Sequence, residues 1–87
     1  MACVYILQSE KTEAFYVGST SEIKRRFREH QQGKVPSTKG MLPVKLLLHQ
    51  QYPTLSLARR IESKLKRFKR RDFLIKIIEA GEIKMRL

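Results

Sequence analysis

Two short apolar segments near the amino terminus decide the fold: CVYIL at residues 3–7 and FYVG at residues 15–18. Both are rich in β-branched and aromatic residues and are separated by a polar stretch, so we expect two antiparallel strands joined by a loop. Neither segment alternates cleanly between polar and apolar residues, which predicts a sheet covered on both faces. Each strand carries one tyrosine, Tyr5 or Tyr16, with an apolar ring and a polar hydroxyl.

Charge is the strongest signal in the composition. The 87 residues hold 19 lysines and arginines against 8 acidic residues, a net charge of +11. Such an excess on so small a chain favours a polyanionic partner, with nucleic acid ahead of an anionic membrane surface or an acidic protein. Charge of this kind supports binding and says nothing of catalysis.

The length and the cysteine content limit the class of protein. We expect a single domain over residues 1–87 with a modest core. No apolar run is long enough to span a membrane, and the start lacks the layout of a signal peptide. Cys3 is the one cysteine, which excludes an internal disulfide and a cysteine-built zinc site. A reducing, cytoplasmic location fits this pattern.

A helix is expected over residues 22–32, and it carries two candidate functional residues. Its apolar residues are few, Ile23 and Phe27, four positions apart. Arg26 and His30 have the same spacing and project beside that apolar stripe. Taken alone, Arg26 reads as a solvated basic side chain and His30 as a half-buried histidine.

The borders of this helix carry standard signals. Ser19 or Ser21 is the expected N-cap, and Gly33 can end the helix.

Residues 34–43 contain two prolines and a glycine and are predicted to be a loop. Here and on the later helix, four basic residues are candidates for contacts with phosphate, against the simpler interpretation that they are solvated: Lys34, Lys39, Arg59 and Arg60.

The second half of the chain predicts a third strand over residues 44–52 and a helix over residues 56–69. The helix is dense with basic residues outside its apolar stripe, and Glu62 projects at the margin of that stripe. From the residues alone, the simpler interpretation is that Glu62 forms an i,i+4 ion pair with Lys66. The more specific alternative is that its carboxylate binds a metal ion. A further amphipathic helix from about residue 73 to Gly81 is expected to cover the core.

Taken together, four motifs resemble the GIY-YIG nuclease superfamily. They are Val4-Tyr5 within the CVY triplet, Tyr16-Val17-Gly18, Arg26-x-x-x-His30 and a helical Glu62. Their order over residues 3–72 is similar to the small stand-alone members and to the amino-terminal nuclease domain of the bacterial excision-repair incision protein. Cys3 stands where the first triplet of the family has glycine, which removes no side chain that the chemistry uses.

This resemblance implies an α+β fold, with a small three-stranded, mainly antiparallel sheet flanked by about three helices. It implies an endonuclease that hydrolyses phosphodiester bonds in DNA with a divalent metal, Mg²⁺ or Mn²⁺. No additional substrate-choosing domain is visible in the sequence, so we expect low sequence specificity and recognition of shape or backbone. A role in DNA repair or processing follows from the same resemblance.

By the same resemblance, five residues form the catalytic site. Tyr5 is the candidate general base and Tyr16 orients water or phosphate. Arg26 can neutralise phosphate with its planar fork, and Glu62 can hold the metal. A free tyrosine is a poor base at neutral pH, whereas an unperturbed histidine titrates close to neutrality, so His30 is a candidate to share the proton transfer. The sequence does not choose between direct action of Tyr5 and a relay through His30.

Two other classes of function stay open. One is a non-catalytic, basic nucleic-acid-binding module that keeps the nuclease fold. The other is a basic protein that docks on a larger nucleoprotein assembly. RNA as a second substrate, and a protein partner or a second copy of the chain as a further ligand, are equally open. No membrane partner is expected.

Overall fold

The computed structural model describes residues 1–68 and 70–84, and within them it confirms a three-stranded antiparallel sheet. The strands are β1 (Ala2–Ser9), β2 (Phe15–Thr20) and β3 (Val44–Tyr52). β1 lies in the middle, in the order β2-β1-β3, so β2 is an edge strand. Each predicted strand segment lies inside one of the observed strands.

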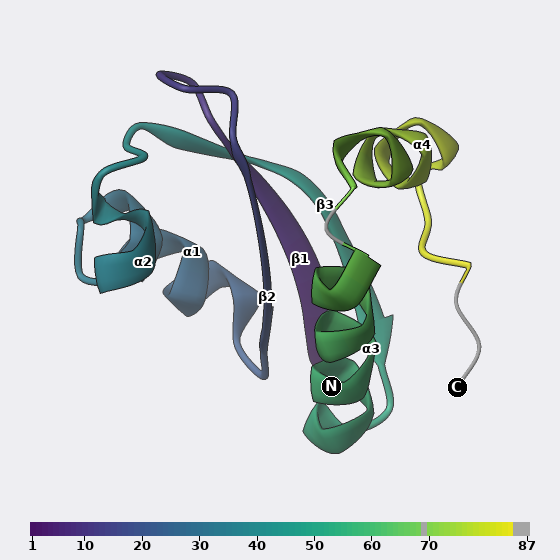
Figure 1. The fold of residues 1–87 in the computed structure, drawn as a ribbon. Helices are drawn as coiled ribbons and strands as arrows, with labels where there is room; N and C mark the ends of the chain where they lie inside the picture. Colours follow the sequence, from purple (N-terminus) through teal and green to yellow (C-terminus); the bar gives the residue numbers. More distant parts are fainter. Residues whose placement is uncertain (69, 85–87) are drawn as a thin grey trace.

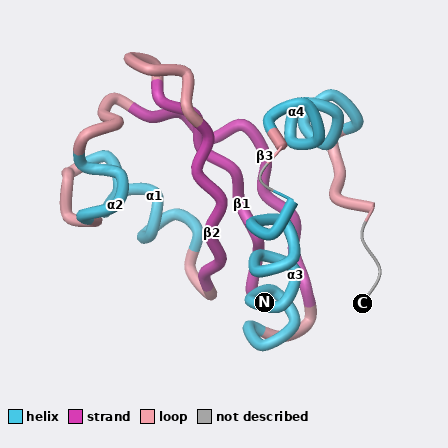
Figure 2. The backbone as a smooth tube through the Cα atoms, in the orientation of Figure 1, coloured by secondary structure: helices cyan, strands magenta, loops and turns pink. Residues whose placement is uncertain are grey.

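Helices cover the sheet on both sides. In the described part of the chain they are α1 (Ile23–Gln31), α2 (Pro36–Lys39), α3 (Leu55–Phe68) and α4 (Arg71–Ala80). Figure 1 shows α1 and α2 on one side of the strands and α3 and α4 on the other, and the backbone tube of Figure 2 shows the same division. No helix among residues 1–68 and 70–84 combines the length and the apolar character needed to cross a bilayer.

Successive side chains of β1 enter two separate apolar clusters, one on each face of the sheet. Val4 and Ile6 belong to the cluster that includes the buried residues of α3. Tyr5 and Leu7 belong to the other cluster, against which residues of α1 pack. This confirms the prediction that both faces are covered, and it explains why β1 reads as a continuous apolar run.

Cys3, the departure from the family triplet, is buried in the same cluster as Tyr5. A thiol in this position acts as a small apolar side chain, and burial raises its pKa.

Two predictions at the start and end of α1 had different outcomes. Gly33 has a φ of 75° and follows the helix, as expected. The N-cap prediction was wrong: the N-cap is Glu22, without a side-chain cap, and the Thr20 hydroxyl accepts a 3.1 Å hydrogen bond from its backbone N–H. Ser19 is instead a strand residue whose hydroxyl binds a residue of α3.

Residues 34–43 were predicted to be a loop, and this was wrong for the short helix α2 within them. Pro36 occupies its first turn, where a missing N–H costs nothing. The single turn carries no periodicity in the sequence, but it buries Thr38 completely. The helix therefore depends on what Thr38 contacts.

The carboxyl-terminal helices lie close to their predicted bounds. The Thr54 hydroxyl accepts a 3.1 Å hydrogen bond from the Leu57 N–H and caps α3. Lys69, the predicted last residue of that helix, and residues 85–87 lie outside the described residues. The helix expected from residue 73 begins two residues earlier, at Arg71.

Gly18 gives Tyr5 its position. The two residues are paired across β1 and β2, and the phenol of Tyr5 lies directly over the glycine. A Cβ atom at Gly18 would be 2.5 Å from both the Cζ and the hydroxyl oxygen of Tyr5. The ring is buried and cannot move aside. The glycine of the YVG triplet is therefore required by the close approach of a phenol.

We predict that Gly18→Ala lowers the free energy of unfolding by about 1–3 kcal/mol, because the added methyl overpacks the contact with Tyr5. Urea denaturation measures this. Gly40→Ala is the matched control, since Gly40 has an ordinary φ of −77° and nothing within 4 Å of the added Cβ. A Gly18→Ala protein as stable as the control variant would contradict the packing described.

Candidate active site

A buried hydrogen bond joins the sheet to α1. The hydroxyl oxygen of Tyr5 on β1 lies 2.8 Å from Nε2 of His30 on α1. Tyr5 is 1% exposed and His30 is fully buried. The sequence placed His30 beside the apolar stripe of the helix, and the structure turns that stripe toward the tyrosine-bearing face of the sheet.

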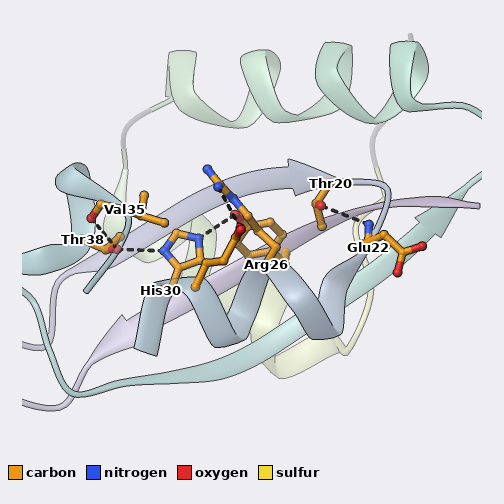
Figure 3. Close-up of polar contacts among 8 residues, drawn as sticks. Thr20, Glu22, Arg26, His30, Val35 and Thr38 are labelled. Atoms are coloured by element: carbon orange, nitrogen blue, oxygen red, sulfur yellow. Dashed lines mark hydrogen bonds and ion pairs between the residues drawn. The ribbon is translucent and has the colours of Figure 1, made fainter. Parts of the chain in front are cut away.

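Thr38 of α2 fixes the state of the imidazole. Its hydroxyl lies 2.8 Å from Nδ1 of His30 and donates its one proton to the Val35 carbonyl at 3.4 Å. Thr38 must then accept from Nδ1–H, which leaves Nε2 of His30 as the acceptor for the Tyr5 hydroxyl. Figure 3 shows this line of contacts from Val35 through Thr38 to His30. The chain of hydrogen bonds can carry a proton from Tyr5 to His30.

Burial keeps both members of this pair neutral. Desolvation raises the pKa of Tyr5 to about 12, although Arg26 pulls it in the opposite direction. Desolvation also lowers the pKa of His30 below its ordinary value of 6.5, and the positive charge of Arg26 acts in the same direction. At neutral pH the resting pair is therefore a phenol and an uncharged imidazole.

Tyr16 and Arg26 complete the polar group on this face. The ring of Tyr16 lies edge-on to His30 with 5.2 Å between centroids, and 6.4 Å from the ring of Tyr5. Arg26 projects from α1 beside His30, as Figure 3 shows, and one guanidinium nitrogen lies 3.3 Å from Glu29. Its side chain is 38% exposed, so the guanidinium is open to an anion arriving from solvent.

Glu62 comes from α3, on the opposite face of the sheet. One carboxylate oxygen accepts a hydrogen bond from the Ser19 hydroxyl on β2, and the other lies 2.5 Å from the Lys66 ammonium. Lys66 in turn lies 5.7 Å from the centre of the Tyr16 ring. Glu62 therefore contacts the edge strand β2 through Ser19, and Lys66 links it to Tyr16 on the same strand.

Four of the five predicted catalytic side chains interact electrostatically. The pKa of Tyr5 is raised by the charges of Tyr16 and Glu62 and lowered by the guanidinium of Arg26. Because such interactions weaken with distance, they support a site shared by these groups. The Glu62–Lys66 ion pair, the simpler of the two interpretations from sequence, is also present. An ion pair does not exclude ligation, because lysine can move away from the carboxylate.

Comparison with known proteins identifies the family of the chain. The family model of the GIY-YIG catalytic domain matches residues 1–76. The chain belongs to the GIY-YIG family. It is 36% identical over 70 residues to a UPF0213 protein of Streptococcus pneumoniae serotype 4, covering 79% of this chain and 70% of that protein. It is similar in structure to the UPF0213 protein of Bacillus halodurans, with a TM-score of 0.57, 30% identity, and coverage of 93% of this chain and 87% of that one.

GIY-YIG nucleases generally use divalent metals, and the donors around Glu62 fit a weakly held ion. Among the described residues no group of three or more histidines, cysteines or acids could hold a metal, and Glu62 is the one carboxylate that the resemblance assigns to it. Mg²⁺ commonly binds through one or two carboxylates and keeps waters that a substrate phosphate can replace. A tightly bound structural metal does not fit this donor set.

The four basic residues predicted to contact phosphate lie outside the candidate active site. Lys34 and Lys39 are exposed, Lys39 as the last residue of α2. Arg59 and Arg60 are exposed on the outer side of α3, where they line an open basic groove of about 590 Å³. The structure brings none of them into contact with Tyr5 or His30.

Sequence reasoning missed the supporting residues of the site. Thr38 was grouped with loop residues that could bind phosphate, and Ser19 was taken as a cap. A proline at the start of a turn gave some signal for α2. For the Ser19 contact with Glu62, separated by 43 positions along the chain, there was none.

The pKa of His30 predicts a pH dependence of stability. The unfolded chain binds a proton at His30 near the ordinary value of 6.5, and the folded protein binds it only at lower pH. The stabilising contribution is therefore complete above 6.5 and is lost as the pH falls toward the folded pKa.

We expect the free energy of unfolding to fall in urea titrations from about pH 7.5 to about pH 5.5, and to fall less in His30→Gln. His49, the other histidine, is exposed on β3, and His49→Gln should retain the wild-type dependence. If the free energy of unfolding depended equally on pH in His30→Gln and in the wild type, His30 would not titrate as described.

Proposed function

We propose that this GIY-YIG protein is a metal-dependent endonuclease that hydrolyses phosphodiester bonds in DNA. The observation that carries the proposal is the buried Tyr5–His30 hydrogen bond, supported by an accessible Arg26 on the same helix as His30 and by the contact of Glu62 with the edge strand β2. The net charge of +11 provides attraction to the substrate. Cytoplasmic DNA repair or processing is the proposed setting.

Water activation is assigned to Tyr5 and His30 acting together. The water gives a proton to the phenolic oxygen while Tyr5 passes its own proton to Nε2 of His30. In the same step the water oxygen attacks phosphorus and the ester bond to the leaving oxygen breaks. The leaving oxygen takes up a proton from solvent, and His30 afterwards releases its additional proton to solvent. Because the pKa of Tyr5 is raised and that of His30 is lowered, the pair does not ionise at rest, so we place this transfer within the attack itself.

Arg26 and Glu62 serve the phosphate. The guanidinium of Arg26 can donate two parallel hydrogen bonds to phosphate oxygens and offset their charge. Glu62 would hold Mg²⁺ or Mn²⁺, which when bound stabilises negative charge on the phosphate and the leaving oxygen. Ser19 orients the carboxylate through its hydroxyl. Tyr16, beside His30, is placed to orient water or a phosphate oxygen.

Glu62→Gln tests the metal assignment. We expect metal-dependent nicking of labelled single-stranded, duplex and branched DNA by the wild type, and a loss of about a hundredfold or more in the variant. Binding in chelator should be retained, because the change removes a negative charge. Glu79→Gln, on the exposed face of α4, is the matched control. Salt-sensitive binding without cleavage by the wild type in any metal would instead support the non-catalytic module.

Arg26→Lys tests the phosphate contact. Lysine keeps the charge but loses the planar fork, so we expect cleavage to fall about tenfold or more. Arg25→Lys is the control, since Arg25 is the exposed neighbour on the same helix. Gel-based cleavage rates measure both. An unchanged cleavage rate in Arg26→Lys would contradict a bidentate contact between Arg26 and the phosphate.

A further inference from the structure

A groove of about 510 Å³ runs beside the candidate active site, between the edge strand β2 and the two carboxyl-terminal helices. Its apolar walls come from β2, α3 and α4, and two cations stand over them. The residues that define the groove are Phe15, Tyr16, Leu65, Lys66, Arg71 and Leu74. Tyr16 and Lys66 belong also to the candidate site, so the groove is continuous with it.

The cations in the groove are held against aromatic rings. The Arg71 guanidinium lies 4.6 Å from the centre of the Phe15 ring, and one of its nitrogens donates a 2.8 Å hydrogen bond to the Glu13 carbonyl. Lys66 lies 5.7 Å from the centre of the Tyr16 ring. An apolar floor with two cations above it suits a ligand that is both flat and anionic, because rings and guanidinium planes stack with nucleobases and cations attract phosphate.

We propose that this groove binds a single unpaired nucleobase next to the scissile phosphate, so that the protein prefers nucleic acid with an unpaired nucleotide at the cut. This proposal rests on the proposed nuclease function, since it places the base beside the phosphate that the site would cleave. A base paired inside a duplex hides its faces between its neighbours and cannot enter such a groove. The substrate class is therefore single strands, or duplexes interrupted by an unpaired nucleotide.

Charge favours this occupant over an apolar peptide or a second copy of the chain. Lys66 and Arg71 both line the groove, and the whole chain carries +11, which opposes self-association through this face. A nucleotide in the groove would place its base against the apolar walls and its phosphate near Lys66 and Arg71.

The first test compares two probes of equal charge in chelator, so that no cleavage occurs. A short oligothymidylate and an abasic oligomer with the same number of phosphates are titrated into the wild type, observed by NMR through the methyl groups of Leu65 and Leu74. We expect the oligothymidylate to shift these signals and to bind about tenfold more tightly than the abasic probe. Equal affinities, or shifts confined to the outer side of α3, would overturn the proposal. Methyl shifts that depend on protein concentration without any probe would overturn it in favour of self-association.

A matched pair of variants tests the groove itself. Arg71→Ala removes the guanidinium from the Phe15 ring, and Arg70→Ala removes the same charge from an exposed neighbour whose nearest acid is Asp72 at 3.8 Å. We expect Arg71→Ala to reduce the preference for the oligothymidylate over the abasic probe. We expect Arg70→Ala to weaken the binding of both probes equally. Equal effects of the two variants on that preference would contradict a role of the groove.

The outcomes separate this inference from the nuclease assignment. Base-dependent binding in the groove without cleavage in any metal would support the groove as a nucleobase site and contradict the nuclease assignment. Metal-dependent cleavage that does not change when a base is missing, at any position of the substrate, would support the nuclease assignment and contradict the role of the groove.

Discussion

The hydrogen bond between the Tyr5 phenol and the His30 imidazole is the contact on which the rest of the site depends. It joins the central strand to α1 inside a buried cluster, where an unmet polar group would be costly. Gly18 makes room for the phenol, and Thr38 contacts the far nitrogen of the imidazole. The presence of both residues is therefore explained by this one buried pair.

The sheet divides the site between its two faces. Phenols, imidazole and guanidinium lie on the face of α1, and the carboxylate comes from α3 on the other. In the proposed site they meet around β2, which is an edge strand that side chains can reach around. A central strand with neighbours on both sides would separate the same residues, so the strand order decides whether a site can form.

Local sequence signals predicted the strands and the longer helices, whereas the proposed catalytic residues came from the family resemblance. The apolar runs place Tyr5 and Tyr16, and helical spacing places Arg26 beside His30, because these signals act over a few residues. Thr38 and Ser19 escaped prediction because each owes its role to a partner brought near by folding. The exposed basic residues have no such geometry, and charge alone could not assign them to a site.

The ion pair between Glu62 and Lys66 bears on how the protein handles divalent ions. A cation that binds this carboxylate competes with the ammonium that already sits there. A bound phosphate gives that ammonium another partner and so frees the carboxylate. Occupancy by ion and by phosphate then rises together through thermodynamic linkage. Under the proposed function, the chain alone would bind a divalent ion only weakly, and the complete site would form on the nucleic acid to be cut.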